Sequence, residues 1–268
     1  MTNDTIGEGK VALVTGAGRG LGRGFAERVA GMGYAVGIHG LTDNEPAEYG
    51  EGTTVTNLAA GIAERFEVET RAVLGDLSIT SNVARVVDEV EQSLGEIDLL
   101  VQNAGGDIAA VGGKPEPNDA IFINEADVRS VLDRNLMTTI FVCQEVARRM
   151  IERRRGRIVT VSSQGAFAAS PAPAIYITAK MGVIAYTRCL ATQLREFEIN
   201  VNCIAPGDVR SGRFLGTREV DPSRLATEGT LDRIATLDEI ARVVEFFAGP
   251  QGDFVSGQVL MVNGGNLP

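Results

Sequence analysis

The feature that most constrains the fold is an alternation, along the whole chain, of short apolar runs with segments of helical periodicity. The apolar runs predict strands at residues 11–14, 35–39, 70–74, 97–101, 157–162, 200–204 and 259–262. The helical pattern predicts helices that end near residue 30 and cover residues 57–66, 82–93, 125–152, 175–197 and 237–248, and the pattern at 125–152 allows a break near its start. Strands that alternate with helices indicate βαβ units and therefore a parallel sheet.

A glycine-rich turn follows the first predicted strand and opens the first predicted helix. It reads Thr15-Gly16-Ala17-Gly18-Arg19-Gly20-Leu21-Gly22. Glycines at this place allow a tight turn and let the backbone approach a pyrophosphate at the helix N-terminus. We therefore expect an α/β protein with a single Rossmann-type, doubly wound parallel β-sheet flanked by helices. Residues 1–268 form one domain in this interpretation, with an N-terminal tail at 1–8 and loops at 41–52, 105–124 and 208–236.

Charge and hydropathy exclude several classes of protein. The net charge of −10 and the pI near 4.8 argue against nucleic acid and anionic membranes as partners. One basic run, Arg148–Arg157, departs from this trend, and we interpret it as a helix C-terminus stopped by Gly156. The polar segment 1–10 lacks an apolar signal core, and no apolar stretch reaches the ~18 residues of a membrane span. A soluble cytoplasmic protein is expected.

Cysteine and histidine usage limits the chemistry further. Cys143, Cys189 and Cys203 are widely spaced, which favours buried reduced thiols over disulfides or a zinc site. His39 is the only histidine, so a multi-histidine metal site and a histidine-based triad are both excluded within the chain. We expect His39 to be a packing residue or a ribose contact at the end of the second strand, and we expect no metal.

Tyr176 and Lys180 form an i,i+4 pair in the predicted helix 175–197, with Ser163 thirteen residues before the tyrosine. A free tyrosine has a pKa of about 10 and is a poor proton acceptor at neutral pH. A nearby ammonium favours the phenolate and makes the tyrosine a better general acid/base. The same spacing arises by chance on exposed helices, so it gains weight only from a cofactor site and a third polar group.

These motifs together resemble the short-chain dehydrogenase/reductase family over about residues 8–265. The resemblance rests on the glycine turn, Asn103-Ala104-Gly105, Ser163, Tyr176 and Lys180 in this order and spacing. It implies an NAD(P)-dependent enzyme that interconverts a secondary alcohol and a carbonyl by hydride transfer. Gln102 stands where the family usually has asparagine, a difference that we expect to be minor.

The resemblance also implies a role for each matching residue. Tyr176 is the expected proton donor or acceptor, Ser163 holds the substrate oxygen, and Lys180 binds the nicotinamide ribose and lowers the Tyr176 pKa. Asn135 matches an asparagine thought to anchor a water in the proton relay, although a local hydrogen bond within the helix is an alternative. The expected cofactor contacts are Thr15, Gly16, Gly18, Arg19, Gly20, Leu21, Gly22, Gly40, Asp76, Leu77, Asn103, Ala104, Gly105, Tyr176, Lys180, Pro206, Gly207, Val209 and Ser211.

The choice between the two nicotinamide cofactors depends on the end of the second strand. NAD-binding units usually carry an acid there that accepts from the ribose 2′-OH, but Gly40 occupies the position. Arg19 lies where relatives that prefer NADP often have a basic residue. Asp43 and Glu45 nearby argue against a phosphate. The sequence favours NADP, with NAD as the alternative.

Substrate selection should depend on the loops after the strand ends, at 106–124, 164–174 and 208–236. The last of these contains five arginines that either bind a carboxylate or phosphate or belong to a solvated lid. We expect a small polar substrate such as a sugar, polyol, or hydroxy or keto acid. Alternatives are a 3-oxoacyl-(acyl carrier protein) reductase and a catalytically silent cofactor-binding sensor. The family resemblance suggests a homotetramer, or a homodimer, built on helices 125–152 and 175–197.

Overall fold

The computed structural model describes residues 6–266, so most of the predicted tail at 1–8 lies outside the described residues. These residues form a seven-stranded sheet with all neighbouring strands parallel, in the order β3-β2-β1-β4-β5-β6-β7. The expected doubly wound parallel sheet is confirmed. Its strands are β1 (Val11–Val14), β2 (Ala35–Gly40), β3 (Thr70–Leu74), β4 (Ile97–Gln102), β5 (Gly156–Val161), β6 (Ile199–Pro206) and β7 (Val259–Val262).

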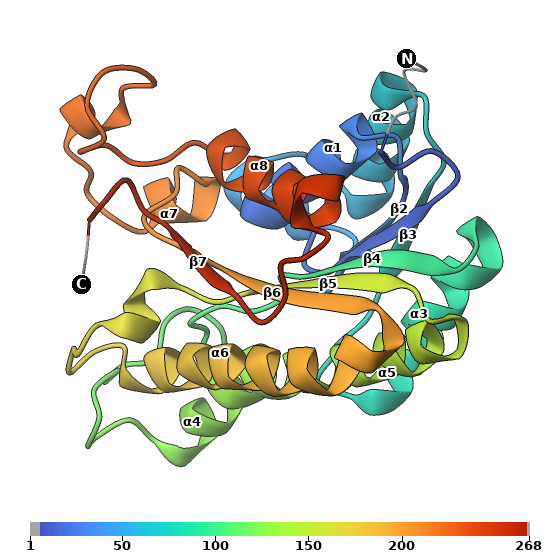
Figure 1. The fold of residues 1–268 in the computed structure, drawn as a ribbon. Helices are drawn as coiled ribbons and strands as arrows, with labels where there is room; N and C mark the ends of the chain where they lie inside the picture. Colours follow the sequence, from blue (N-terminus) through green and yellow to red (C-terminus); the bar gives the residue numbers. More distant parts are fainter. Residues whose placement is uncertain (1–5, 267–268) are drawn as a thin grey trace.

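Helices cover both faces of the sheet (Figure 1). One apolar cluster joins the sheet to α1 (Gly20–Gly31), α2 (Val55–Phe66) and α8 (Leu237–Ala248). A second joins the opposite face to α3 (Thr80–Leu94), α5 (Thr138–Arg153) and α6 (Ala174–Leu194). Central strands are buried on both sides, which explains why their sequences are continuous apolar runs rather than alternating ones.

The predicted helix 125–152 is interrupted. The structure has α4 (Glu125–Leu132), one π-helical turn (Asp133–Met137) and then α5. Within the turn, the Thr138 hydroxyl donates to the Asp133 carbonyl at 2.9 Å. Such widened turns occur frequently at functional sites, and this one contains Asn135. The interruption therefore places a predicted site residue at a local departure from helical geometry.

The predicted loops contain short elements. Segment 41–54 has a 3₁₀ turn (Glu45–Tyr49), and segment 208–236 has α7 (Gly212–Gly216) and a second 3₁₀ turn (Pro222–Leu225). Segments 105–124, 164–173 and 208–236 extend from one side of the molecule, at the left of Figure 1. Ligands of open parallel sheets bind at the carboxyl ends of the strands, and these segments surround those ends.

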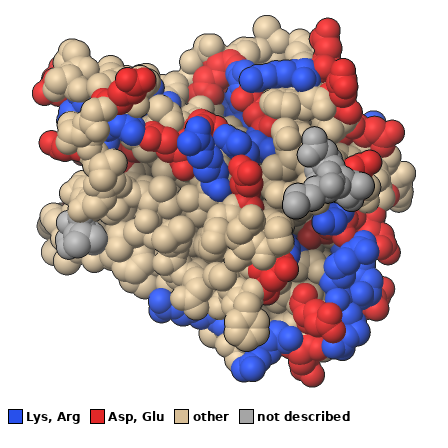
Figure 2. Space-filling view, turned by 45° about the horizontal axis from the view of Figure 1, so that its top comes forward, with Lys and Arg blue, Asp and Glu red and all other residues tan. Residues whose placement is uncertain are grey.

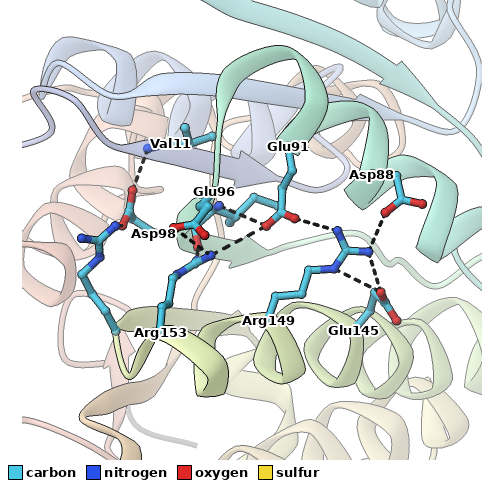
Figure 3. Close-up of polar contacts among 10 residues, drawn as sticks. Val11, Asp88, Glu91, Glu96, Asp98, Glu145, Arg149 and Arg153 are labelled. Atoms are coloured by element: carbon cyan, nitrogen blue, oxygen red, sulfur yellow. Dashed lines mark hydrogen bonds and ion pairs between the residues drawn. The ribbon is translucent and has the colours of Figure 1, made fainter.

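The basic run Arg148–Arg157 is neutralised by acids (Figure 3). Arg149 contacts Asp88, Glu91 and Glu145, each at 2.7 Å. In the same figure, Arg153 lies between Glu91, at 3.9 Å, and one further carboxylate, that of Glu96, at 3.8 Å. This network ties α3 to α5. On the face shown in Figure 2, basic side chains mostly border acidic ones, and a broad area carries neither.

Two details of the sequence interpretation were wrong. The helix before β5 does not stop at Gly156, because it ends at Arg153, with Arg154 in the left-handed region at φ 50° and Gly156 already in the strand. Cys143 and Cys203 are buried as expected, but Cys189 is exposed because it lies on the outward face of α6. Within residues 6–266, none of the helices is both long and apolar enough to cross a membrane.

Candidate active site

Strand β1 pairs with β2 on one side and with β4 on the other. The chain leaves β1 toward β2 and leaves β4 toward β5, in opposite directions across the sheet, so a crevice forms between the carboxyl ends of β1 and β4. Thr15 joins these two ends. Its hydroxyl donates to Gln102 Oε1 at 2.8 Å and accepts from the backbone N–H groups of Asn103 and Ala104, both at 3.0 Å. Thr15 is fully buried, and its role is to fix the glycine turn to the segment after β4.

The glycine turn is shaped for close backbone approach. Gly16 and Gly20 have φ of +59° and +53°, in the left-handed region. A Cβ on Gly22 would lie 1.9 Å from the Gly16 carbonyl oxygen and 2.7 Å from Asn103 Nδ2, which leaves no room for a side chain. The turn leads directly into α1, whose first N–H groups form an anion site. These residues therefore fit a dinucleotide with its pyrophosphate at the start of α1.

An internal carboxylate already lies at this helix start. Glu51 Oε2 accepts from the Gly20 N–H at 2.6 Å, and its Oε1 accepts from the Gly212 N–H at 2.8 Å. The Glu51 oxygens thus stand in for the phosphate oxygens that the glycine turn would otherwise bind. An anion at this position confirms that the local backbone is suited to negative charge.

Glu45 places a second acid at the end of β2. Its Oε2 accepts from the Leu41 N–H at 3.1 Å and lies 3.2 Å from the position that a Cβ on Gly40 would have. Arg19 pairs with Glu45 at 3.6 Å and also with Glu48. Glu45, Glu48 and Glu51 all belong to segment 41–54, which contains the predicted loop 41–52.

His39 connects the end of β2 to the glycine turn. Its Nε2 lies 2.9 Å from the Gly75 carbonyl, and its Nδ1 accepts from the Gly16 N–H at 3.2 Å. Burial lowers its pKa from 6.5 to about 4, so the ring is neutral near pH 7, with the proton on Nε2. His39 is thus a packing residue of the cleft wall rather than a general base.

A cleft of about 350 Å³ runs from the glycine turn to Tyr176. The predicted cofactor contacts that line it are Gly16, Arg19, Gly20, Leu21, Gly22, Asp76, Leu77, Asn103, Ala104, Gly105, Tyr176, Val209 and Ser211. The remaining predicted contacts, which do not line it, are Thr15, Gly18, Gly40, Lys180, Pro206 and Gly207. His39, Glu45 and Arg213, which the sequence analysis considered in other roles, also line the cleft. Lining residues that sequence reasoning missed are Leu41, Glu51, Gly75, Ile108, Arg134 and Thr138.

A second cavity of about 480 Å³ adjoins the first and is lined by Ser163, Tyr176 and Gly207 together with parts of segments 106–118 and 208–218. Tyr176 lines both spaces. Its side chain therefore lies where a bound cofactor and a bound substrate would meet. Ser163 Oγ accepts from the Gly165 N–H at 3.2 Å, which orients the serine at the start of a 3₁₀ turn (Gln164–Phe167).

The protonation of Tyr176 is determined by opposing effects. Burial raises the pKa of its phenol, and the charge of Asp107 acts in the same direction. The neighbouring Ser163 hydroxyl and the charges of Arg213 and Arg218 oppose this rise in pKa. On balance the pKa is raised, so the phenol is protonated near neutral pH. The expectation that Lys180 lowers this pKa is not met, because burial of the phenol outweighs the groups that oppose the rise.

Lys180 lies beneath Tyr176 in α6, with Nζ 5.8 Å from the ring centroid. Its Nζ donates to the Val161 carbonyl at 2.9 Å, and burial lowers its pKa to about 8. The residue is buried, so the ammonium is fixed in place by β5. Ser162, the residue before Ser163, donates its hydroxyl to the Lys180 carbonyl at 2.8 Å. Ser162 therefore binds the α6 backbone, whereas Ser163 lines the second cavity.

Asn135 hydrogen-bonds to the backbone of the segment that follows β4. Its Nδ2 donates to the carbonyls of Gly106 and Val131 at 2.9 and 2.8 Å, and its Oδ1 accepts from the Gly106 N–H at 2.9 Å. A Cβ on Gly105 would lie 2.6 Å from Asn135 Oδ1 and 3.3 Å from Lys180 Nζ. Glycine at 105 therefore lets the Asn135 and Lys180 side chains both lie close to the backbone at this residue. The sequence analysis left two roles open for Asn135, a site residue that anchors a water and a local hydrogen bond within the helix. The two are compatible, because the amide makes its local hydrogen bonds within this site.

Comparisons with known proteins place the chain in a family. Residues 10–219 match the family model described as short chain dehydrogenase. A cyclohexanol dehydrogenase from Rhodococcus sp. (strain TK6) is 35% identical over 99% of this chain and 98% of its own length. A 3-oxoacyl-[acyl-carrier-protein] reductase from Aquifex aeolicus (strain VF5) is 32% identical over 96% of this chain and 97% of its own.

Solved structures agree with these sequence relatives. A 7α-hydroxysteroid dehydrogenase complexed with NADH and 7-oxo glycochenodeoxycholic acid matches with a TM-score of 0.82 and 26% identity, covering 100% of this chain and 98% of that one. An acetoin dehydrogenase from Salmonella typhimurium matches with a TM-score of 0.79 and 26% identity, covering 96% of this chain and 95% of that one. The chain therefore belongs to the short-chain dehydrogenase/reductase family and is an NAD(P)-dependent oxidoreductase that acts on alcohol or keto groups.

Proposed function

We propose that this enzyme interconverts a small polar secondary alcohol and its carbonyl, with Tyr176 as the general acid/base. The observation that carries the proposal is the position of Tyr176, which lines both the cofactor cleft and the adjoining cavity. When bound, the dinucleotide supplies the hydride acceptor for oxidation or the hydride donor for reduction. A group that moves the accompanying proton has to reach the substrate oxygen beside that carbon.

Residues of the protein transfer the proton and stabilise the charge on the substrate oxygen. In reduction, the Tyr176 phenol donates its proton to the carbonyl oxygen as the adjacent carbon receives hydride. In oxidation, the phenolate takes the hydroxyl proton as that carbon loses hydride. Ser163 hydrogen-bonds the same substrate oxygen, so developing negative charge meets two fixed donors. Lys180, fixed by the Val161 carbonyl, contributes positive charge below Tyr176. The family resemblance implies that it would also hold the nicotinamide ribose, although Lys180 does not line the cofactor cleft in this structure.

Asn135 positions this group of residues through the backbone. Its amide holds Gly106, and Gly105 beside it leaves the space in which Lys180 Nζ lies. A proton relay through a water at Asn135 is compatible with these contacts, because the Oδ1 atom can accept a second hydrogen bond. We retain Asn135, Ser163, Tyr176 and Lys180 as the proposed catalytic residues of a chain that we treat as a single domain.

For the cofactor we now favour NAD(H), with NADP(H) as the alternative. The sequence alone favours NADP(H), because Gly40 has no carboxylate and Arg19 is basic. Two contacts support the opposite preference: Glu45 brings a carboxylate to Gly40, and Arg19 is paired with Glu45 and Glu48. A carboxylate there accepts from a ribose 2′-OH and repels a 2′-phosphate.

The charged lining of the second cavity supports a small polar substrate. Five charged side chains line it, namely Asp107, Lys114, Asp208, Arg213 and Arg218. A long acyl chain favours an aliphatic lining. The relative from Aquifex aeolicus keeps 3-oxoacyl reduction as the second candidate. A catalytically silent sensor is a weaker alternative, because Tyr176 lines both spaces, Ser163 lines the second, and Lys180 lies beneath Tyr176.

Steady-state kinetics test the proposal. We expect purified enzyme to oxidise NADH with a polar ketone or oxo acid, and Tyr176→Phe to lower kcat by at least about a hundredfold while the dissociation constant for NADH stays within about twofold. Retained turnover in Tyr176→Phe would remove the acid/base role. Faster turnover of 3-oxoacyl thioesters than of polar ketones would favour the second candidate. Fluorescence titration with NADH and NADPH tests the cofactor preference, which tighter NADPH binding would overturn.

We also propose a homotetramer, with a homodimer as the alternative. The support is apolar exposure on α6 and near β7, where Met181 is 42% exposed, Leu260 is 42% exposed and Phe254 is fully exposed. Surfaces of this kind are typical of contacts between subunits. Light scattering of the purified protein measures the mass directly, and a monomer would exclude both assemblies.

A further inference from the structure

The five arginines of segment 208–236 differ in what they bind. Three of them do not line the cavity beside Tyr176. Their partners lie elsewhere: Arg210 donates to the Leu225 carbonyl at 2.7 Å, Arg224 lies 4.0 Å from the Asp232 carboxylate, and Arg233 donates to Glu239 at 2.8 Å. These three stabilise the segment and its junction with α8. The other two, Arg213 and Arg218, line the cavity.

Arg213 and Arg218 have different surroundings. Arg218 lies 3.4 Å from the Asp208 carboxylate, and its guanidinium stacks 4.6 Å from the centroid of the Phe214 ring. Arg213 is half-buried, and its Nη2 donates to the Asp107 carbonyl at 2.8 Å. Among residues 6–266, no carboxylate lies within 4.0 Å of the Arg213 guanidinium. A guanidinium has five N–H donors, so Arg213 retains donors for a ligand.

The charges that line the cavity leave a positive excess. Lys114, Arg213 and Arg218 contribute three positive charges, and Asp107 and Asp208 contribute two negative ones. Asp208 is already paired with Arg218, and Asp107 Oδ2 accepts from Asn118 Nδ2 at 2.8 Å. A local excess of positive charge is notable in a chain with a net charge of −10. It makes the cavity attractive to an anionic group.

We propose that the substrate carries a carboxylate and that Arg213 binds it, so that this enzyme acts on hydroxy acids and oxo acids. This inference rests on the proposed function, since it specifies which substrate occupies the cavity beside Tyr176. A half-buried, planar guanidinium suits the two oxygens of a carboxylate. Arg213 also lines the cofactor cleft, so the competing role is a contact with the cofactor pyrophosphate. The experiment has to separate these two anions.

Isothermal titration calorimetry on the NAD⁺-saturated enzyme makes that separation. The probes are 2-, 3- and 4-oxo carboxylic acids, each compared with its own primary amide. Enzyme, NAD⁺ and an oxo acid cannot react, because both the cofactor and the probe are already oxidised. Four proteins are compared: wild type, Arg213→Gln, Arg213→Lys and Arg224→Gln. The last is the matched control, with the same charge change in the same segment but outside the cavity.

We expect wild type to bind at least one oxo acid about ten- to a hundredfold more tightly than its amide. Arg213→Gln should abolish this preference without changing the affinity for the amide, Arg213→Lys should retain part of it, and Arg224→Gln should match wild type. Equal affinity for every acid and its amide in wild type would overturn the proposal. A loss of NAD⁺ affinity in Arg213→Gln as large as the loss of acid affinity would assign Arg213 to the pyrophosphate instead. Failure of the dehydrogenase proposal would appear separately, as absent hydride transfer from alcohols to NAD⁺ despite intact acid binding.

Discussion

Glu51 binds the first N–H group of the helix that the cofactor would use, with its Oε2 2.6 Å from the Gly20 nitrogen. Its other oxygen binds the Gly212 N–H at the start of α7. One carboxylate therefore links segment 41–54, the glycine turn and the substrate loop. Because the helix start favours a single anion, we expect Glu51 and a bound dinucleotide phosphate to compete for the same donors.

This competition predicts that Glu51→Ala binds NADH more tightly than wild type. Releasing the Gly20 and Gly212 donors and removing one negative charge should lower the dissociation constant about tenfold, a change of about 1.4 kcal/mol. Fluorescence titration measures the effect. Glu64→Ala, which removes an exposed carboxylate from α2, is the control and should leave the affinity unchanged. Weaker NADH binding in Glu51→Ala would show that Glu51 supports the bound cofactor rather than competing with it.

Glu45 predicts a change in cofactor preference. Replacing its carboxylate in Glu45→Gln removes the charge next to Gly40 and frees Arg19 from one of its two acids. We expect NADPH to bind about tenfold more tightly, because a nearby like charge no longer repels the 2′-phosphate. NADH should bind somewhat more weakly. Glu48→Gln is the matched control, since Glu48 also pairs with Arg19 but does not line the cleft. An equal gain in both variants would mean that freeing Arg19, and not removing the acid, changes the preference.

Local pattern was sufficient for the strands and for the core of the site. The apolar runs located every strand to within about two residues, and motif spacing brought Ser163 and Tyr176 together in one cavity. The position of Glu45 beside Gly40 and that of Glu51 at the helix start could not be predicted in this way, because their partners at Leu41, Gly20 and Gly212 are set by how segment 41–54 folds over the cleft. The acids of this segment were the one available signal, and Asp43 and Glu45 argued only against a phosphate. The pattern at 125–152 allowed a break near its start but did not identify a π-helical turn, because a contact with Gly106 in a distant loop accompanies that turn.

His39 predicts a loss of stability in acid. Its folded-state pKa of about 4 lies below the 6.5 of an unfolded histidine, so the unfolded chain binds a proton first as the pH falls. The contribution of His39 is therefore complete above pH 6.5 and is lost as the pH falls through 4. Between pH 7 and pH 4.5, the free energy of unfolding that is lost through His39 should amount to about 2 to 3 kcal/mol.

Urea unfolding of wild type and His39→Gln at both pH values isolates this contribution. Glutamine offers a donor for the Gly75 carbonyl and an acceptor for the Gly16 N–H, and it does not titrate. The free energy of unfolding should fall by about 2 kcal/mol less in the variant than in wild type. An identical fall in both proteins would mean that carboxylates alone cause the acid sensitivity.

Arg149 predicts a stability defect that depends on salt. It contacts acids of α3 and α5 at once, and its side chain is only 24% exposed (Figure 3). Arg149→Met should lower the free energy of unfolding by about 1 to 2 kcal/mol, more than an isolated surface pair, because three carboxylates lose their shared cation. The defect should shrink in 1 M salt, where the screening length is about 3 Å. Arg148→Met is the control, since this neighbour is 71% exposed and has a single pair at 3.5 Å, and it should change stability by less than about 0.5 kcal/mol. Equal effects of the two substitutions in urea unfolding would show that the network contributes no more than one exposed ion pair.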